Sequence, residues 1–161
     1  MPKEELGVKK MSLSRYRAWD SEANIMIYSD HRTRKLYDVY YGFEMNGEGE
    51  LECRWEGEFT ESHVLDGGTL DNLMQFTGIH DKNGKKIFEG DIVRYTWDML
   101  TEKGKKVRIS KVFWSDWRAS WAVGKKPCDN DLFRYVRNGN TVEVIGNIYE
   151  NPELLTMQEE D

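Results

Sequence analysis

A strict alternation between apolar and polar side chains at residues 51–59 is the most constraining pattern in this sequence. The apolar positions of this segment are Leu51, Cys53, Trp55 and Phe59, with Gly57 in the same register. Charged residues occupy the positions between them. A period of two places successive side chains on opposite faces of a β-strand. We therefore expect a strand here with one buried face and one solvated face.

Other short apolar runs point to the same class of structure, because they are rich in aromatic and β-branched side chains. We expect strands at 15–20, 25–28, 36–45, 73–79, 86–88, 92–97, 107–114, 121–123 and 142–149. Asp66-Gly67-Gly68 is expected to form a loop, and Asn151-Pro152-Glu153 to begin a short terminal helix capped by Asn151. The predicted fold is mainly β, with an N-terminal β-rich lobe and a small, partly open, SH3-like β-barrel that ends in this helix.

The clearest local signal is Asn83-Gly84, which lies between the apolar runs at 73–79 and 86–88. Asparagine followed by glycine supplies the positive φ angles of a tight primed turn, so the segment is predicted to be a β-hairpin. Glu89-Gly90-Asp91 marks the next turn. The residues that we assign to structural turns are Asn83, Gly84, Gly90 and Asp91.

The length of 161 residues is sufficient to bury a core without disulfide or metal staples. Turn-forming residues place a lobe boundary between about Gly67 and Leu73. We expect a flexible arm at 1–13, an acidic β-rich lobe at 14–70, a barrel lobe at 71–156 and an acidic tail at 157–161.

No apolar run reaches the roughly 18–20 residues of a membrane span, and two distant cysteines favour a reducing compartment. We expect a cytoplasmic protein without membrane partners.

Charge is distributed unevenly along the chain. The net charge is −6 over residues 1–79, +3 over 80–155 and −3 over 156–161. The total of −6 repels nucleic acid at long range, so any nucleic-acid binding requires a local basic patch.

Three separated motifs resemble the phage YopX family. The central motif runs from Leu73 through Asp81-Lys82-Asn83-Gly84 to Val93, and the terminal motifs are Tyr16–Asp20 and Glu143–Leu154. The resemblance spans about Tyr16 to Leu155 and is weakest between Asp98 and Gly139. It implies a β-rich protein that is encoded by a phage or prophage and carried in the cytoplasm of the bacterial host. It brings no catalytic residues with it.

No catalytic or metal-binding constellation is visible. The histidines stand too far apart for metal-ligand spacing: His31, His63 and His80. Cys128 follows two lysines, but no histidine is close in sequence to act as its base. The turn at 81–91 resembles part of a calcium loop, yet Ile92 occupies the position of the required twelfth-position glutamate. We expect no enzyme activity, no metal and no cofactor.

The second lobe combines many aromatic residues with many basic ones. Small barrels with this composition bind single-stranded nucleic acid by stacking bases on aromatic rings beside cations. Aromatic residues also fill small cores, which we expect of Trp97 and Phe113. Trp117 differs, because it stands in a polar loop beside Arg118. The candidate residues for binding a partner or nucleic acid are Trp114, Trp117, Arg118, Lys105, Lys106, Lys125 and Lys126.

Two functions from different classes remain open. The leading expectation is a non-enzymatic accessory protein that interacts with a host or phage protein. The alternative is a nucleic-acid-binding module that uses the basic, aromatic barrel. Exposed strand edges in an open barrel also favour self-association into a homo-oligomer.

Overall fold

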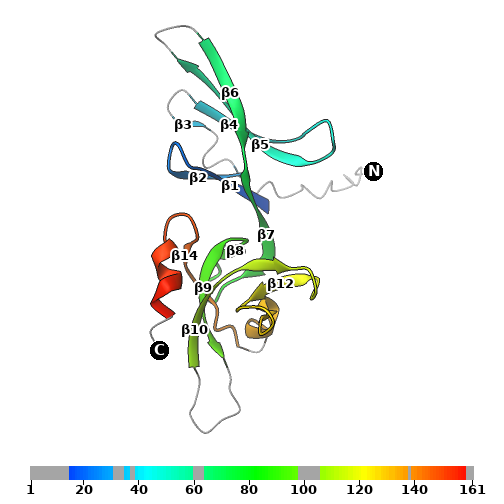
Figure 1. Cartoon of the computed structure of the whole chain (residues 1–161), viewed down its shortest axis with the longest axis vertical. Coiled ribbons are helices and arrows are strands. Elements are labelled where there is room, and N and C mark those ends of the chain that lie inside the picture. The colour runs from blue at the N-terminus through cyan, green and yellow to red at the C-terminus, as the bar shows by residue number, and fades with distance from the viewer. Residues whose placement is uncertain are drawn as a thin grey trace, which may run out of the picture. The chain divides into compact units, whose positions relative to one another are not determined.

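A computed structural model describes residues 15–30, 35–36, 39–59, 64–97, 106–137 and 139–158 (Figure 1). The chain forms two compact units, Met1–Leu73 and Met74–Asp161. The described part is mainly β, and a sheet curls into a half-barrel. This confirms that the fold is mainly β, as predicted. The arm expected at 1–13 lies outside the described residues. Within the described ranges, no helix has the length and apolarity that crossing a membrane requires.

The first unit contains a hairpin and a separate antiparallel sheet. The hairpin pairs β1 (Tyr16–Asp20) with β2 (Ile25–Tyr28). The sheet has the order β3 (Lys35–Leu36), β4 (Val39–Met45), β5 (Leu51–Phe59) and β6 (Val64–Leu70). The strand predicted at 25–28 coincides with β2, and the one predicted at 51–59 coincides with β5.

The core of the first unit forms around Cys53, which is buried together with Ala18, Ile27 and Tyr41. The alternation along β5 has its expected result, because Cys53 and Gly57 are buried while Arg54 and Glu56 are exposed. Burial raises the pKa of the Cys53 thiol to about 12, with a further contribution from the charge of Asp20. Cys53 is therefore a buried apolar residue and not a nucleophile.

A carboxylate at the edge of this core organises the β1–β2 hairpin. Asp20 accepts hydrogen bonds from the backbone N–H groups of Glu22 and Ala23, both at 3.0 Å. Its other oxygen accepts a bond from the Tyr41 hydroxyl at 2.8 Å. Burial, followed by the bond to Asp20, raises the pKa of Tyr41. The aspartate therefore closes the turn and links the hairpin to β4.

The prediction of a loop at Asp66-Gly67-Gly68 is wrong, because these residues lie within β6 and pair with β5. A Cβ atom added at Gly67 would lie 2.9 Å from the backbone oxygen of Trp55. One added at Gly68 would lie 2.9 Å from the indole nitrogen of Trp55. The glycines are needed because β6 runs close against the bulky Trp55, and they do not mark a turn.

We predict that Gly67→Ala lowers the free energy of unfolding by about 1–3 kcal/mol, because the added methyl group must displace backbone. Gly42→Ala in β4 is the matched control, since no atom lies within 4 Å of a Cβ added there. The control should stay within about 0.5 kcal/mol of the wild type or be slightly more stable. Urea unfolding measures both, and equal stability of the two variants would contradict the crowding at Gly67.

The second unit contains the remaining strands and two short helical segments. β7 (Asn72–His80), which starts just before the unit boundary, forms a hairpin with β8 (Lys86–Phe88). One sheet has the order β10 (Lys106–Lys111), β9 (Asp91–Trp97) and β14 (Glu143–Asn147). Another has the order β11 (Phe113–Ser115), β12 (Ser120–Val123) and β13 (Asn130–Asp131). The 3₁₀ segments are η3 (Leu132–Tyr135) and η4 (Pro152–Gln158).

The core of the second unit joins residues of β8, β9, β12 and η3 with two valines from connecting segments. Its buried members are Ile87, Val93, Tyr95, Val112, Val123, Leu132, Tyr135 and Val142. Val112 separates β10 from β11, so the single strand predicted at 107–114 is two strands in the structure. Phe113 is half-buried, and the side chain of Trp97 lies outside the described residues.

The turn between β7 and β8 is longer than the tight primed turn that Asn83-Gly84 predicts. Gly84 has a φ of 78°, but Asn83 is not among the described residues with positive φ. The carboxylate of Asp81 accepts the backbone N–H groups of Asn83 and Lys85, each at 2.9 Å. Because this carboxylate holds the loop open across five residues, only one left-handed position is needed.

Asn151 stands at the predicted N-cap position of η4, where its backbone carbonyl accepts the N–H of Leu154 at 3.1 Å. Its side-chain oxygen accepts the N–H of Asn147 at 3.3 Å. Asn147 in turn accepts the N–H groups of Tyr149 and Glu150. A Cβ atom added at Gly146 would lie 2.5 Å from the Asn151 oxygen. The two asparagines therefore form a compact link between β14 and η4.

Candidate functional site

An aromatic pair on the β11–β12 hairpin forms one part of the candidate site. Trp114 lies opposite Trp121 in the register of the two strands. Their rings meet edge to face, with centroids 5.3 Å apart. Trp121 also packs against the core, whereas 46% of Trp114 is exposed. Trp121 therefore supports Trp114 from the core side and leaves part of its ring accessible.

The segment η3 supplies the second part. A 3₁₀ helix has three residues per turn, so residues three apart lie on the same side. Leu132 and Tyr135 accordingly face the core, while Phe133 and Arg134 are exposed. Phe133 leaves 55% of its surface exposed. Burial of its neighbours therefore presents this aromatic ring to the solvent.

A continuation of this turn brings a second arginine to the same side. The N–H groups of Val136 and Arg137 both bond to the carbonyl oxygen of Phe133, at 3.1 Å. Arg137 therefore lies just past the end of η3, and it lines the same groove as Arg134. Within the ranges that the structure describes, neither guanidinium has an ion-pair partner.

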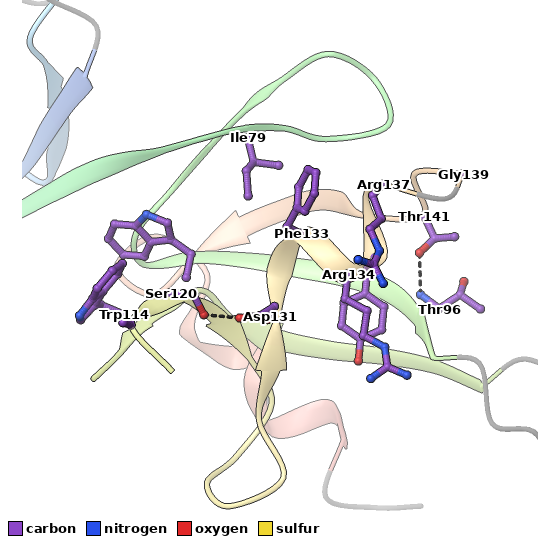
Figure 2. A pocket seen from close by; sticks show the side chains of 13 residues that line it. Ile79, Thr96, Trp114, Ser120, Asp131, Phe133, Arg134, Arg137, Gly139 and Thr141 are labelled. Carbon is purple, nitrogen blue, oxygen red and sulfur yellow. Dashed lines mark hydrogen bonds between the residues drawn. The ribbon is translucent and has the colours of Figure 1, made fainter. Parts of the chain in front are cut away.

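These side chains line one groove of about 910 Å³ (Figure 2). Figure 2 shows Trp114 at one end, Arg134 and Arg137 at the other, and Phe133 between them. Asp131 also lines the groove, where its carboxylate accepts a hydrogen bond from Ser120. The groove therefore has an aromatic end and a cationic end.

Two tyrosines whose rings are in contact lie beside the cationic end. The rings of Tyr95 and Tyr135 have centroids 4.6 Å apart, and Tyr135 also lines the groove. Burial raises the pKa of Tyr95 to about 12. Burial also raises the pKa of Tyr135, and the charge of Arg134 offsets part of that rise. Both phenols are therefore neutral near pH 7, and the charge at this end comes from the arginines.

A second exposed tryptophan stands on the turn between β11 and β12. Trp117 is 57% exposed, and the guanidinium of Arg118 lies over its ring at 4.2 Å from the centroid. The Nε atom of Arg118 is 3.6 Å from a carboxylate oxygen of the fully buried Asp129. The same oxygen accepts a bond from the Ser115 hydroxyl at 3.0 Å. The buried carboxylate thus holds the arginine, and the arginine covers one face of Trp117.

The model of the YopX protein family matches residues 15–156 of this sequence. The chain belongs to the YopX family. Among solved structures, it is similar to protein EF1440 from Enterococcus faecalis, with 24% sequence identity and a TM-score of 0.48. That comparison covers 88% of this chain and 96% of EF1440. A search of curated proteins finds no significant match.

The structure of this YopX family member separates the residues that the sequence suggested as one site. Trp114 lines the groove, whereas Trp117 and Arg118 form their own stack on the adjacent turn. The described lysines do not line it, since Lys106 is exposed at the start of β10 and Lys125 and Lys126 are exposed beyond β12. Lys105 lies outside the described residues.

The groove also contains residues that sequence reasoning left out of the site, namely Phe133, Arg134 and Arg137. A local signal for them exists in Leu132-Phe133-Arg134-Tyr135. Its two apolar residues three positions apart fit a 3₁₀ turn with Phe133 outside. A pattern of four residues is too short to distinguish this turn from a strand end.

The residues predicted to form turns make hydrogen bonds and packing contacts that hold the fold together. The Asp81 carboxylate is buried and accepts three backbone N–H groups, including that of Val144 at 3.0 Å. Asp91 is buried and accepts the N–H of Phe88 at 2.8 Å. Gly90 has a φ of 79° and packs against Met74. Among the described residues, no group of three His, Cys, Asp or Glu side chains could hold a metal ion.

Proposed function

We propose that this YopX family member is a non-enzymatic accessory protein whose second unit docks a partner protein in the groove between the β11–β12 hairpin and η3. The gathering of exposed aromatic rings supports this proposal most strongly. In the described part of the second unit, the exposed large hydrophobic side chains are Val107, Trp114, Trp117 and Phe133. All but Val107 belong to the hairpin and η3. Soluble proteins rarely expose such patches without a partner, and aromatic anchors dominate interface energies.

The proposal extends to the setting in which the protein acts. We place it in the cytoplasm of a bacterial host, encoded by a phage or prophage, with a host or phage protein as its partner. We describe the second unit as an SH3-like, partly open barrel. Barrels of that kind bind peptides in aromatic-lined grooves, which agrees with a groove built from Trp114 and Phe133.

A nucleic-acid-binding function is the second candidate, and the two arginines beside exposed rings favour it. Bases would stack on the aromatic rings while phosphates contact Arg134 and Arg137. Phosphate contacts make affinity fall steeply with salt. A salt titration combined with nuclease treatment therefore separates the two functions, because nuclease destroys a nucleic-acid partner and leaves a protein partner bound.

We predict that Trp114→Ala combined with Phe133→Ala abolishes partner binding. Each ring is expected to act as an anchor whose removal costs at least about 2 kcal/mol, or roughly thirtyfold in affinity. The tagged full-length chain is cross-linked to its partner and treated with nuclease. The amount of partner protein recovered with the chain is then measured. Val107→Ala is the matched control, because Val107 is equally exposed in the same unit but does not line the groove.

Recovery of the partner by the wild type and by Val107→Ala, but not by the double variant, is the expected result. Equal recovery by all three proteins would remove the groove as the docking site. Recovery that depends on nucleic acid would favour the second candidate.

A further inference from the structure

We infer that the groove takes a short, extended, acidic peptide segment of the partner. Its apolar side chain lies between Trp114 and Phe133, and its carboxylates bind Arg134 and Arg137. This inference rests on the proposed function, since it names the chemistry of the segment that docks in the same groove. It follows from the two unlike ends of the groove.

The cationic end is shaped for carboxylates. Arg134 lies in η3 and Arg137 lies just past its end, and both side chains stand at the same end of the groove (Figure 2). Neither has an ion-pair partner in the described part of the chain. A guanidinium group offers a rigid fork of donors that matches a carboxylate in two parallel hydrogen bonds. Two such groups at one end of the groove therefore fit a segment with two acidic residues.

The aromatic end carries no described cation of its own. Trp114 and Phe133 line it together with Ile79, an apolar residue. The nearest arginine on the hairpin turn is Arg118, which is occupied by Asp129 and by its stack on Trp117. This end therefore favours an uncharged apolar or aromatic side chain.

A peptide fits this distribution better than a nucleic acid does. A single strand presents a phosphate at every nucleotide and needs cations along its whole path. In the described groove the cations stand at one end only, and the carboxylate of Asp131 lies between the ends.

The size of the groove agrees with a short segment. Ligand pockets usually measure about 300–1,000 Å³, and this groove of about 910 Å³ lies at the upper end of that range. An extended peptide places alternate side chains on the same side, so one segment can reach both ends.

Selection from a displayed library of random 12-residue peptides by the full-length protein tests the inference. We expect the enriched peptides to carry at least two Asp or Glu residues on one side of an apolar or aromatic residue. For the best peptide, Arg134→Gln with Arg137→Gln should raise the dissociation constant at least tenfold. The same change should abolish the selection for acidic residues. Both arginines are exposed, so the thermal unfolding of this variant should match the wild type.

Lys125→Gln with Lys126→Gln is the matched control, because it removes two exposed cations that do not line the groove. It should leave the affinity of the selected peptide unchanged. Enrichment of peptides without acidic residues, or no enrichment at all, would overturn the inference. Displacement of the peptide by a 12-nucleotide oligo(dT) whose binding needs the same arginines would also overturn the inference, and it would favour nucleic acid as the ligand.

The failures of this inference and of the proposed function are distinguishable. If the partner protein requires Trp114 and Phe133 but the library shows no acidic preference, the docking site stands and its assigned peptide chemistry is wrong. If the partner is recovered equally without those two rings, the docking site itself is wrong, whatever the library selects.

Discussion

Replacing Asp81 with alanine is expected to lower the free energy of unfolding by about 3 kcal/mol, since three backbone N–H groups lose their acceptor. These groups belong to Asn83, Lys85 and Val144. The carboxylate is buried and connects the β7–β8 turn to β14, which lies far away in sequence. Urea unfolding followed by tryptophan fluorescence measures the loss.

Two further variants make the Asp81 prediction specific. Asp81→Asn keeps one acceptor oxygen in place, so it should lose only part of the stability. Asp116→Ala removes an exposed carboxylate from another turn and should change stability by less than about 0.5 kcal/mol. Asp81→Ala matching Asp116→Ala would mean that water replaces the aspartate at little cost.

Leu132→Ala is the second change with a large expected effect, a loss of about 2–5 kcal/mol in the free energy of unfolding. Leu132 is fully buried among core residues of β9, β12 and the segment just before β14, so truncation leaves a cavity. Because Leu132 anchors η3, the same cavity loosens the turn that presents Phe133. Urea unfolding measures the stability of the variant.

Phe133→Ala is a demanding control for Leu132→Ala, because it removes a larger side chain from the neighbouring position. Phe133 is 55% exposed, so its truncation should cost about 1 kcal/mol or less. Leu132→Ala should therefore be destabilising with partial loss of binding, and Phe133→Ala should be stable with loss of binding. Similar losses of stability for both variants would contradict the inward and outward assignment along η3.

The groove can be altered without unfolding the protein, because the exposed residues that line it differ from the buried residues that support them. The side chains that line its two ends are exposed, as Trp114, Phe133, Arg134 and Arg137 illustrate. The side chains that hold them in place are buried beneath, as Leu132 and Tyr135 are. Surface substitutions are therefore expected to change binding, whereas substitutions one residue away are expected to change folding.

Local sequence patterns were sufficient for the mainly β class and for several strands. The alternation at 51–59 defined β5, and the run at 25–28 defined β2, because the period of two depends only on neighbouring residues. The family resemblance was also readable, since its motifs are contiguous and the matched region covers residues 15–156. These features depend on short stretches of the chain, so the sequence by itself determined them.

Tertiary packing decided the features that depend on distant partners. Gly67 and Gly68 suggest a turn when only neighbours are considered, but the approach of Trp55 from β5 places them in a strand. Asn83-Gly84 suggests a tight turn, but the carboxylate of Asp81 forms a longer one. The groove joins β11, η3 and the residues before β14, which are separated in sequence. Only folding brings these surfaces together, so no local period could reveal that Phe133, Arg134 and Arg137 share a site with Trp114.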